Sequence, residues 1–199
     1  MGRDKALLEW QGRPLIEHAL ARLHRLGLHP SILGTRPDLE TFAPVIADNF
    51  PGHGPLGGIE AALSTSDTDL NLFLPVDLPL LPVEFLRWLI ARAHLTQAAA
   101  TIPRIEGRPQ PLCAVYHRRL LSGIQASLQQ EDAKVTRAIE NSARGAGLRI
   151  DCFDAEAIAA AQADPGTWLR AFPVHRWFAN LNTPGDLARA ALEQRPLIH

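Results

Sequence analysis

The feature that most constrains the fold is a regular alternation of short apolar runs with segments of helical spacing. Runs of strand length lie at 30–35, 45–48, 71–77, 98–103, 111–116 and 148–153, and helical segments lie at 14–27, 57–66, 82–95, 117–128, 133–143 and 183–194. This alternation predicts an α/β domain with a mostly parallel sheet covered on both faces. A chain of 199 residues without a repeat or linker predicts a single domain over 1–199.

The start of the chain departs from this alternation. An α/β chain usually opens with a strand, whereas the first clear element here is the helical segment at 14–27. Nothing in "MGRDKALLEWQG" has the pattern of a strand. Either the fold starts differently or its first strand is missing from this sequence.

Composition argues against several classes of protein. The formal net charge of −1 argues against binding nucleic acid by bulk charge. No apolar stretch approaches the roughly 18 residues of a spanning helix, and the N-terminus lacks the apolar core of a signal peptide. Cys113 and Cys152 have no metal-binding spacing and are interpreted as buried thiols of a reducing compartment. We expect a cytoplasmic protein without nucleic-acid or membrane partners.

Two aspartates follow apolar runs. Asp77 ends "NLFLPVD" and Asp48 ends "VIAD". In open α/β sheets, ligands bind beyond the carboxyl ends of the strands. Mg²⁺ prefers one or two carboxylates together with phosphate oxygens and water, so these positions suit such an ion. An Asp77 that caps the following turn explains the pattern equally well.

A glycine-rich loop, "GHGPLGGIEAAL", opens the helical segment at 57–66. Glycine permits positive φ and a close approach of backbone to a ligand, and a helix N-terminus attracts anionic groups. The loop could hold a base or a phosphate. A tight turn before a helix is the simpler interpretation of the loop taken alone.

Two further segments carry weaker signals. Lys5 in "MGRDKALL" could neutralise charge on a triphosphate, although a solvated lysine explains the residue more simply. Asn180 and Asn182 in "NLNTPGDL" could orient a polar ligand, but asparagine ahead of a helix is also ordinary turn chemistry.

Together the segments are more specific. In chain order, "MGRDKALLEWQGRPLIEHAL", "ADNFPGHGPLGGIEAAL", "LFLPVDLPLLP", "RPQPLCAVYHRRLL" and "NLNTPGDLARA" resemble molybdenum cofactor guanylyltransferases. These belong to the Mg²⁺-dependent nucleotidyltransferases with a Rossmann-like, three-layer fold. The resemblance spans nearly the whole chain. It implies that the protein transfers GMP from GTP to molybdenum-molybdopterin, forming the guanine dinucleotide cofactor and pyrophosphate.

The resemblance also implies roles for individual residues. Lys5 matches the phosphate-side lysine, Asp48 a nucleotide-binding aspartate, and Asp77 the Mg²⁺-binding aspartate of the family motif. A loop on the guanine side is matched by Gly54, Pro55, Leu56 and Gly57. A segment near the pterin acceptor is matched by Asn180 and Asn182.

One departure from the family motif matters. In the family, a strand and a Leu-Ala-Gly-Gly loop precede the "MG-x-DK" segment, whereas here Met1 coincides with its methionine. We therefore expect an N-terminal truncation relative to the motif, with two explanations: the gene start is assigned too far downstream, or the chain is truly truncated. One alternative function is then a catalytically impaired protein that binds nucleotide.

The implied reaction is a single in-line displacement whose nucleophile, the terminal phosphate of molybdopterin, is already an anion. Catalysis then consists of alignment and charge neutralisation by Lys5, Asp77 and Mg²⁺. Implied partners are proteins that deliver molybdopterin and chaperones of molybdoenzymes. A cytidylyl- or sugar-nucleotidyltransferase of the same fold is a further alternative.

Overall fold

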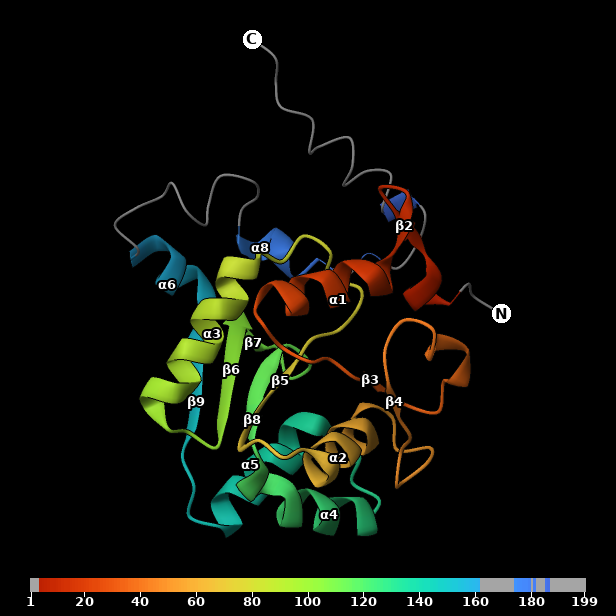
Figure 1. The fold of residues 1–199 in the computed structure, drawn as a ribbon. Helices are drawn as coiled ribbons and strands as arrows, with labels where there is room; N and C mark the ends of the chain where they lie inside the picture. Colours follow the sequence, from red (N-terminus) through yellow and green to blue (C-terminus); the bar gives the residue numbers. More distant parts are fainter. Residues whose placement is uncertain (1–3, 162–173, 180, 182–184, 187–199) are drawn as a thin grey trace. The chain divides into compact units, whose positions relative to one another are not determined.

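The computed structural model describes residues 4–161, 174–179, 181 and 185–186 (Figure 1). The chain divides into two compact units, each described here by itself. The first unit combines the described residues of the ranges 1–29, 75–85 and 156–199, and the second unit combines 30–74 with 86–155. The single-domain expectation is not decided by this division and stays a prediction. No helix in the described part of the chain is long and apolar enough to span a bilayer.

The first unit opens with one turn of 3-10 helix, followed by a short hairpin and an α-helix. Gln11 and Gly12 form the two-residue turn with φ of 50° and 76°, the backbone that two-residue hairpins favour. The sequence pattern did not reveal this hairpin. The elements of this unit are η1 (Lys5–Leu7), β1 (Glu9–Trp10), β2 (Arg13–Pro14), α1 (Leu15–Arg25) and α8 (Val174–Trp177).

The second unit contains most of the alternating elements that the sequence predicts. They are β3 (Ile32–Leu33), η2 (Pro37–Leu39), β4 (Val45–Ile46), α2 (Pro55–Thr65), β5 (Leu70–Phe73), β6 (Ala100–Ile105), β7 (Arg108–Pro109), β8 (Ala114–His117), η3 (Arg118–Leu120), α4 (Leu121–Gln129), α5 (Val135–Gly145) and β9 (Ile150–Asp154). Helices α3 (Val83–Thr96) and α6 (Ala155–Ala161) each run across the boundary between the units.

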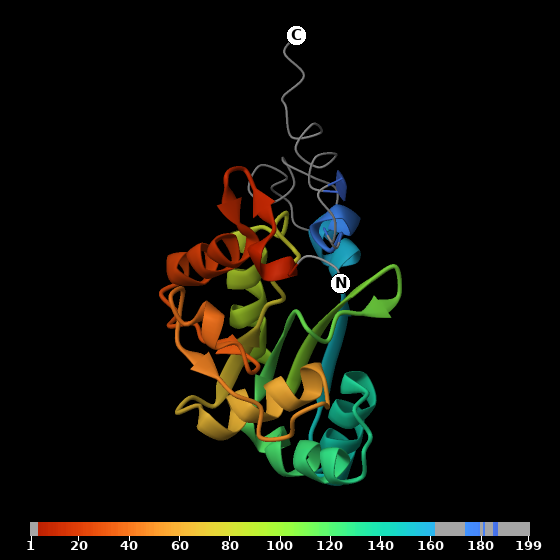
Figure 2. The same ribbon diagram turned by 90° about the vertical axis from the view of Figure 1, so that its right-hand side faces the viewer.

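The sheet of the second unit corrects one expectation. Its strands follow the order β5-β8-β6-β7, with β9 also paired to β6. Only β6–β9 and the separate β3–β4 pair are parallel, whereas β5–β8, β6–β8 and β6–β7 are antiparallel. The cause is a reversal at Glu106 and Gly107, which have φ of 49° and 74°. Figure 2 shows this β6–β7 hairpin (green) projecting from the sheet. The α/β class is confirmed, but the sheet is mixed rather than mostly parallel.

Two strands of the second unit keep an open edge. Within the described residues, β5 pairs only with β8, and β3 pairs only with β4. The expectation of a strand missing from the sequence concerns none of the described residues and stays a prediction.

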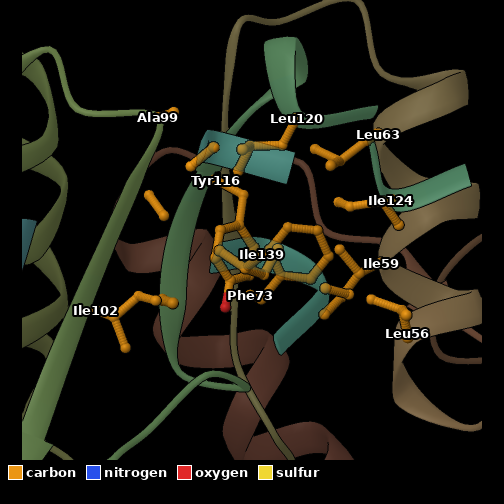
Figure 3. Packing of buried hydrophobic residues seen from close by; sticks show 14 of the residues in the cluster. Leu56, Ile59, Leu63, Phe73, Ala99, Ile102, Tyr116, Leu120, Ile124 and Ile139 are labelled. Atoms are coloured by element: carbon orange, nitrogen blue, oxygen red, sulfur yellow. The ribbon is translucent and has the colours of Figure 1, made fainter. Parts of the chain in front are cut away.

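One face of the sheet carries the main core (Figure 3). Phe73 of β5 and Tyr116 of β8 meet with ring centroids 5.4 Å apart. Helices α2, α4 and α5 cover these rings with fully buried side chains, among them Ile59, Ile124 and Ile139. The apolar spacing of these helices therefore corresponds to one shared buried face.

The other face of the sheet is covered by α3. Trp88 lies edge-on to Phe153 of β9, with ring centroids 5.0 Å apart. Arg92 makes a bidentate pair with Asp151, donating from Nε at 2.6 Å and from Nη2 at 2.9 Å. The next residue, Cys152, is exposed. The expectation of two buried thiols is therefore correct for Cys113 and wrong for Cys152, whose strand β9 pairs only with β6 among the described strands.

Candidate functional site

The first unit brings together two of the predicted residues. The ammonium group of Lys5 lies 3.5 Å from Oδ2 of Asp77. Lys5 begins η1, which Asp4 caps by accepting a hydrogen bond of 3.0 Å from the amide of Ala6. The Lys5 side chain is 53% exposed and that of Asp77 is 16% exposed. An accessible cation thus lies against a carboxylate that is largely shielded from water.

The sequence predicted that Asp77 ends a strand, and the structure shows that it does not. Strand β5 ends at Phe73, because Pro75 interrupts the run and cannot donate to a ladder, and Asp77 lies in the turn beyond it. The carbonyl oxygen of Asp77 accepts a hydrogen bond of 3.1 Å from the amide of Leu181. A C-terminal segment therefore helps to hold the backbone of this turn.

Arg22 of α1 supports the segment that follows Asp77, a role that the sequence analysis missed. Its Nη1 donates to the carbonyl oxygens of Leu78 at 2.6 Å and Leu81 at 3.1 Å. The residue is 8% exposed, so these bonds compensate a guanidinium largely removed from water. Arg22 lies seven residues after Leu15, on the apolar face of the helix, and this position was the signal in the sequence that its side chain would be buried.

Aromatic side chains hold the C-terminal segment within the same unit. Phe85 lies 5.6 Å from Trp177 and 5.7 Å from Phe178, measured between ring centroids. Trp177 is fully buried. The predicted acceptor-side residues Asn180 and Asn182 lie outside the described residues.

In the second unit, Asp48 follows β4 by two residues and turns toward α2. Its Oδ1 is buried and has no hydrogen-bond partner within the described residues. Burial raises the pKa of this carboxyl above its usual range. A buried acceptor without a donor is costly, and a ligand that brings N–H groups would satisfy it.

The glycine-rich loop packs closely against the segment that contains Asp48. Gly54 has φ of 58° and ψ of −146° at the N-cap of α2, and Pro55 occupies the first turn. A Cβ on Gly57 would lie 2.9 Å from the carbonyl oxygen of Phe50, so that position requires glycine. Leu56 is fully buried and fixes the helix to the core. These contacts show the tight turn that the sequence analysis considered, and ligand contact at the loop stays a prediction.

The donor groups suit Mg²⁺ bound mainly by a substrate. No group of three or more His, Cys, Asp or Glu side chains that could hold a metal occurs in the part of the chain that the structure describes. Asp77 offers one carboxylate, which suits an ion that keeps phosphate oxygens and waters as its other ligands. Asp48 belongs to the other unit, and shared binding of one ion by the two aspartates stays a prediction.

Solved structures share the fold of this chain. The chain superposes on 2-C-methyl-D-erythritol 4-phosphate cytidylyltransferase from Thermus thermophilus with a TM-score of 0.61 and 16% identity, covering 96% of this chain and 94% of the other. Molybdopterin-guanine dinucleotide biosynthesis protein A from Archaeoglobus fulgidus gives a TM-score of 0.72 and 23% identity, covering 96% and 92%. The chain therefore has the same fold as this cytidylyltransferase and this biosynthesis protein.

Sequence comparison is more specific. Residues 1–145 match the MobA-like NTP transferase domain, and the chain belongs to this family of nucleotidyltransferases. It is 34% identical, over an alignment 201 positions long, to the "Probable molybdenum cofactor guanylyltransferase" of Methanothermobacter thermautotrophicus. That alignment covers 94% of this chain and 90% of the relative. The resemblance noted from the motifs is thereby confirmed.

Proposed function

We propose that the protein transfers GMP from GTP to molybdenum-molybdopterin, forming the guanine dinucleotide cofactor and releasing pyrophosphate. The observation that carries this proposal is 34% identity, over nearly the full length of both chains, to a relative named as a molybdenum cofactor guanylyltransferase. The contacts of Lys5 and of Asp48 support it independently, one for the phosphate chain and the other for the base.

Lys5 and Asp77 suit the triphosphate part of the substrate. A half-exposed ammonium can neutralise charge on a phosphate oxygen, and the Asp77 carboxylate can hold Mg²⁺. When bound, Mg²⁺ would offset the negative charge of the triphosphate and of the departing pyrophosphate. In the structure the two side chains pair with each other, so nucleotide binding would exchange this ion pair for contacts with the substrate.

Asp48 suits the base. Guanine presents the donors N1–H and N2–H₂ side by side on its Watson–Crick edge, whereas adenine and cytosine each present one amino group and acceptors there. The buried, unpaired Oδ1 of Asp48 is an acceptor that guanine can satisfy and that the other two bases satisfy less well. The loop of Gly54, Pro55, Leu56 and Gly57, which packs against this segment, would line the same part of the site.

The chemical step needs no general base. A terminal phosphate oxygen of molybdopterin attacks the α-phosphorus of GTP, the new P–O bond forms, and the bond to the bridging α–β oxygen breaks to release pyrophosphate. The nucleophile is already an anion, so no proton has to be removed. The chain's task is to align the two phosphates and to neutralise charge, which Lys5 and Asp77 are suited to do.

Other parts of the proposal rest on the resemblance alone. Asn180 and Asn182 would contact the pterin acceptor, and molybdopterin-delivering proteins and molybdoenzyme chaperones would be partners.

We also propose a cytoplasmic location, which the free thiols of Cys113 and Cys152 support. CTP as an alternative substrate has weaker support, because the cytidylyltransferase that shares the fold is only 16% identical.

Pyrophosphate release tests the proposal. The purified protein is given Mg²⁺ and molybdenum-molybdopterin, with GTP and CTP in parallel reactions. Release with GTP that depends on the acceptor supports the assignment. Release that is faster with CTP would instead identify a cytidylyltransferase. No release with either nucleotide, together with calorimetric binding of GTP, would indicate a protein that only binds nucleotide.

A further inference from the structure

We propose that Glu60 is a positioning residue for guanine discrimination: through Asn49, its buried carboxylate fixes Asp48 in the orientation that accepts hydrogen bonds from the base. The inference rests on the proposed function, in which Asp48 contacts guanine. It assigns a role to a charged residue of α2 that the motifs did not single out.

Glu60 is a buried acid with two neutral donors. It is 1% exposed, although it carries a carboxylate. The Nδ2 of Asn49 donates to its Oε2 at 3.0 Å, and the Nε2 of Gln125 on α4 donates to its Oε1 at 2.7 Å. No lysine, arginine or histidine of the described chain contacts this carboxylate.

An apolar side chain would be the cheaper choice for packing at this position. A buried carboxylate without a paired cation is unfavourable, and hydrogen bonds from amides offset only part of the cost. A carboxylate has two acceptor oxygens, so Glu60 can bind the side-chain amides of Asn49 and Gln125 at the same time. One of these amides belongs to α4 and the other to the residue next to Asp48.

The segment 48–50 lies against α2 at three successive points. The carbonyl oxygen of Phe50 lies 2.9 Å from the position that a Cβ on Gly57 would take. Oδ1 of Asp48 lies 3.6 Å from the corresponding position at Gly58. The third point is the hydrogen bond from Asn49 to Glu60. Asn49 lies between Asp48 and Phe50 in the sequence, so its contact falls between the other two.

Of these three contacts, the one at Glu60 is the directional one. The contacts at Gly57 and Gly58 restrict how closely the segment can approach α2, whereas a hydrogen bond to a carboxylate also fixes orientation. Asn49 is further held by Oγ of Ser64 at 3.2 Å. Because a paired contact with two donors of a base requires a fixed carboxylate, loosening Asn49 should lower selectivity more than it lowers stability.

Calorimetric binding of GTP and ITP tests this role. ITP keeps the N1–H of the base and lacks the 2-amino group, so the ratio of the two dissociation constants measures discrimination. We expect a ratio of about tenfold or more in the unaltered protein. Asn49→Ala removes the connection from an exposed residue and keeps every apolar side chain of the core, and we expect the ratio to fall to about threefold or less. Glu60→Met should have the same effect, and Glu60→Gln, which keeps one acceptor, should restore part of the ratio.

Two control variants separate the possible explanations. Gln125→Met removes a donor from the same carboxylate but leaves Asn49 in place, so it should lower the melting temperature and leave the ratio unchanged. Asp48→Asn tests the underlying assignment and should abolish discrimination. If Asp48→Asn keeps the ratio, the assignment of Asp48 to the base is wrong. If Asp48→Asn abolishes it while Asn49→Ala leaves it unchanged, or if Gln125→Met lowers it equally, the role of Glu60 is overturned and that of Asp48 stands.

Discussion

Lys5 and Asp77 form an ion pair of 3.5 Å between a half-exposed ammonium and a largely shielded carboxylate. Pairs with an exposed partner usually contribute only about 0–1 kcal/mol to stability. This pair is therefore a weak reason for the fold to keep both residues, and a chemical role explains their proximity better. Variants of each residue separate the two explanations.

Asp77→Asn keeps the shape of the side chain and removes its charge. We expect Mg²⁺-dependent GMP transfer to fall roughly a hundredfold or more, the scale of a lost electrostatic stabiliser. The measurement is the rate of transfer at saturating GTP across a series of Mg²⁺ concentrations. Asp67→Asn, at an exposed position, is the matched control and should leave the rate unchanged. Full turnover by Asp77→Asn with native circular dichroism would remove Asp77 from the mechanism.

Lys5→Gln removes the cation and retains a polar side chain. We expect the free energy of unfolding to change by no more than about 1 kcal/mol, because the pair is half-exposed. Transfer should nevertheless slow by at least about tenfold, since charge on the phosphate chain is no longer neutralised. Lys5→Arg, which restores the charge, should recover part of the rate. A purely structural residue would show the reverse pattern, with stability lost and the rate retained.

The raised pKa of Asp48 predicts that a change in pH has opposite effects on the stability of the fold and on GTP affinity. Burial raises the pKa of its carboxyl in the folded state above the unfolded value of about 3.9. Between these two values the folded state binds more protons, so the contribution of Asp48 to stability declines as pH rises through the window. Under the proposed assignment of Asp48 to the base, the ionised carboxylate is the form that accepts from guanine, so GTP affinity should decline as pH falls through the folded pKa.

The check on Asp48 is a comparison of the unaltered protein with Asp48→Asn. Asp48→Asn should melt at a higher temperature than the unaltered protein at pH 7, and the difference should shrink toward acid pH. Calorimetry over the same range should show that GTP affinity falls more steeply with decreasing pH in the unaltered protein than in Asp48→Asn, because protonation of the GTP phosphate affects both proteins equally. A melting difference that does not vary with pH would contradict the raised pKa.

Gly57→Ala tests the close approach of the segment 48–50 to α2. The added Cβ would meet the backbone oxygen of Phe50 at 2.9 Å, so the segment must move. We expect a loss of about 1–3 kcal/mol, the usual cost of overpacking, together with weaker GTP binding. Gly145→Ala is the control, because no atom lies within 4 Å of its Cβ and alanine favours a helix. Equal melting temperatures for the two variants would show that the contact at Gly57 is unimportant.

The sequence predicted the helices better than the sheet. Apolar residues at helical spacing located α1, because this helix buries one face, whereas α2 and α3 were located by the glycine-rich turn and by Pro82 that precede them. The mixed sheet was not predicted, because its direction depends on a reversal at Glu106 and Gly107, and this pair was not recognised as a hairpin turn. The turn at Gln11 and Gly12 was missed for the same reason.

The site was predicted by resemblance more than by physics. Alone, Lys5 looks like a solvated terminal residue, and only the fold shows that it lies against Asp77. The pairing of Arg22 with backbone carbonyls and of Glu60 with two amides depends on contacts between segments far apart in the chain. The roles of Asn180 and Asn182, which lie outside the described residues, remain predictions.

The product of the reaction tests the central claim most directly. The protein is incubated with Mg²⁺, molybdenum-molybdopterin and an equimolar mixture of GTP and CTP, and the products are identified by mass spectrometry. We predict one new species, molybdopterin joined to GMP through a pyrophosphate linkage, formed in equal amount to the released pyrophosphate. A cytosine dinucleotide as the main product, or pyrophosphate release without any dinucleotide, would contradict the account.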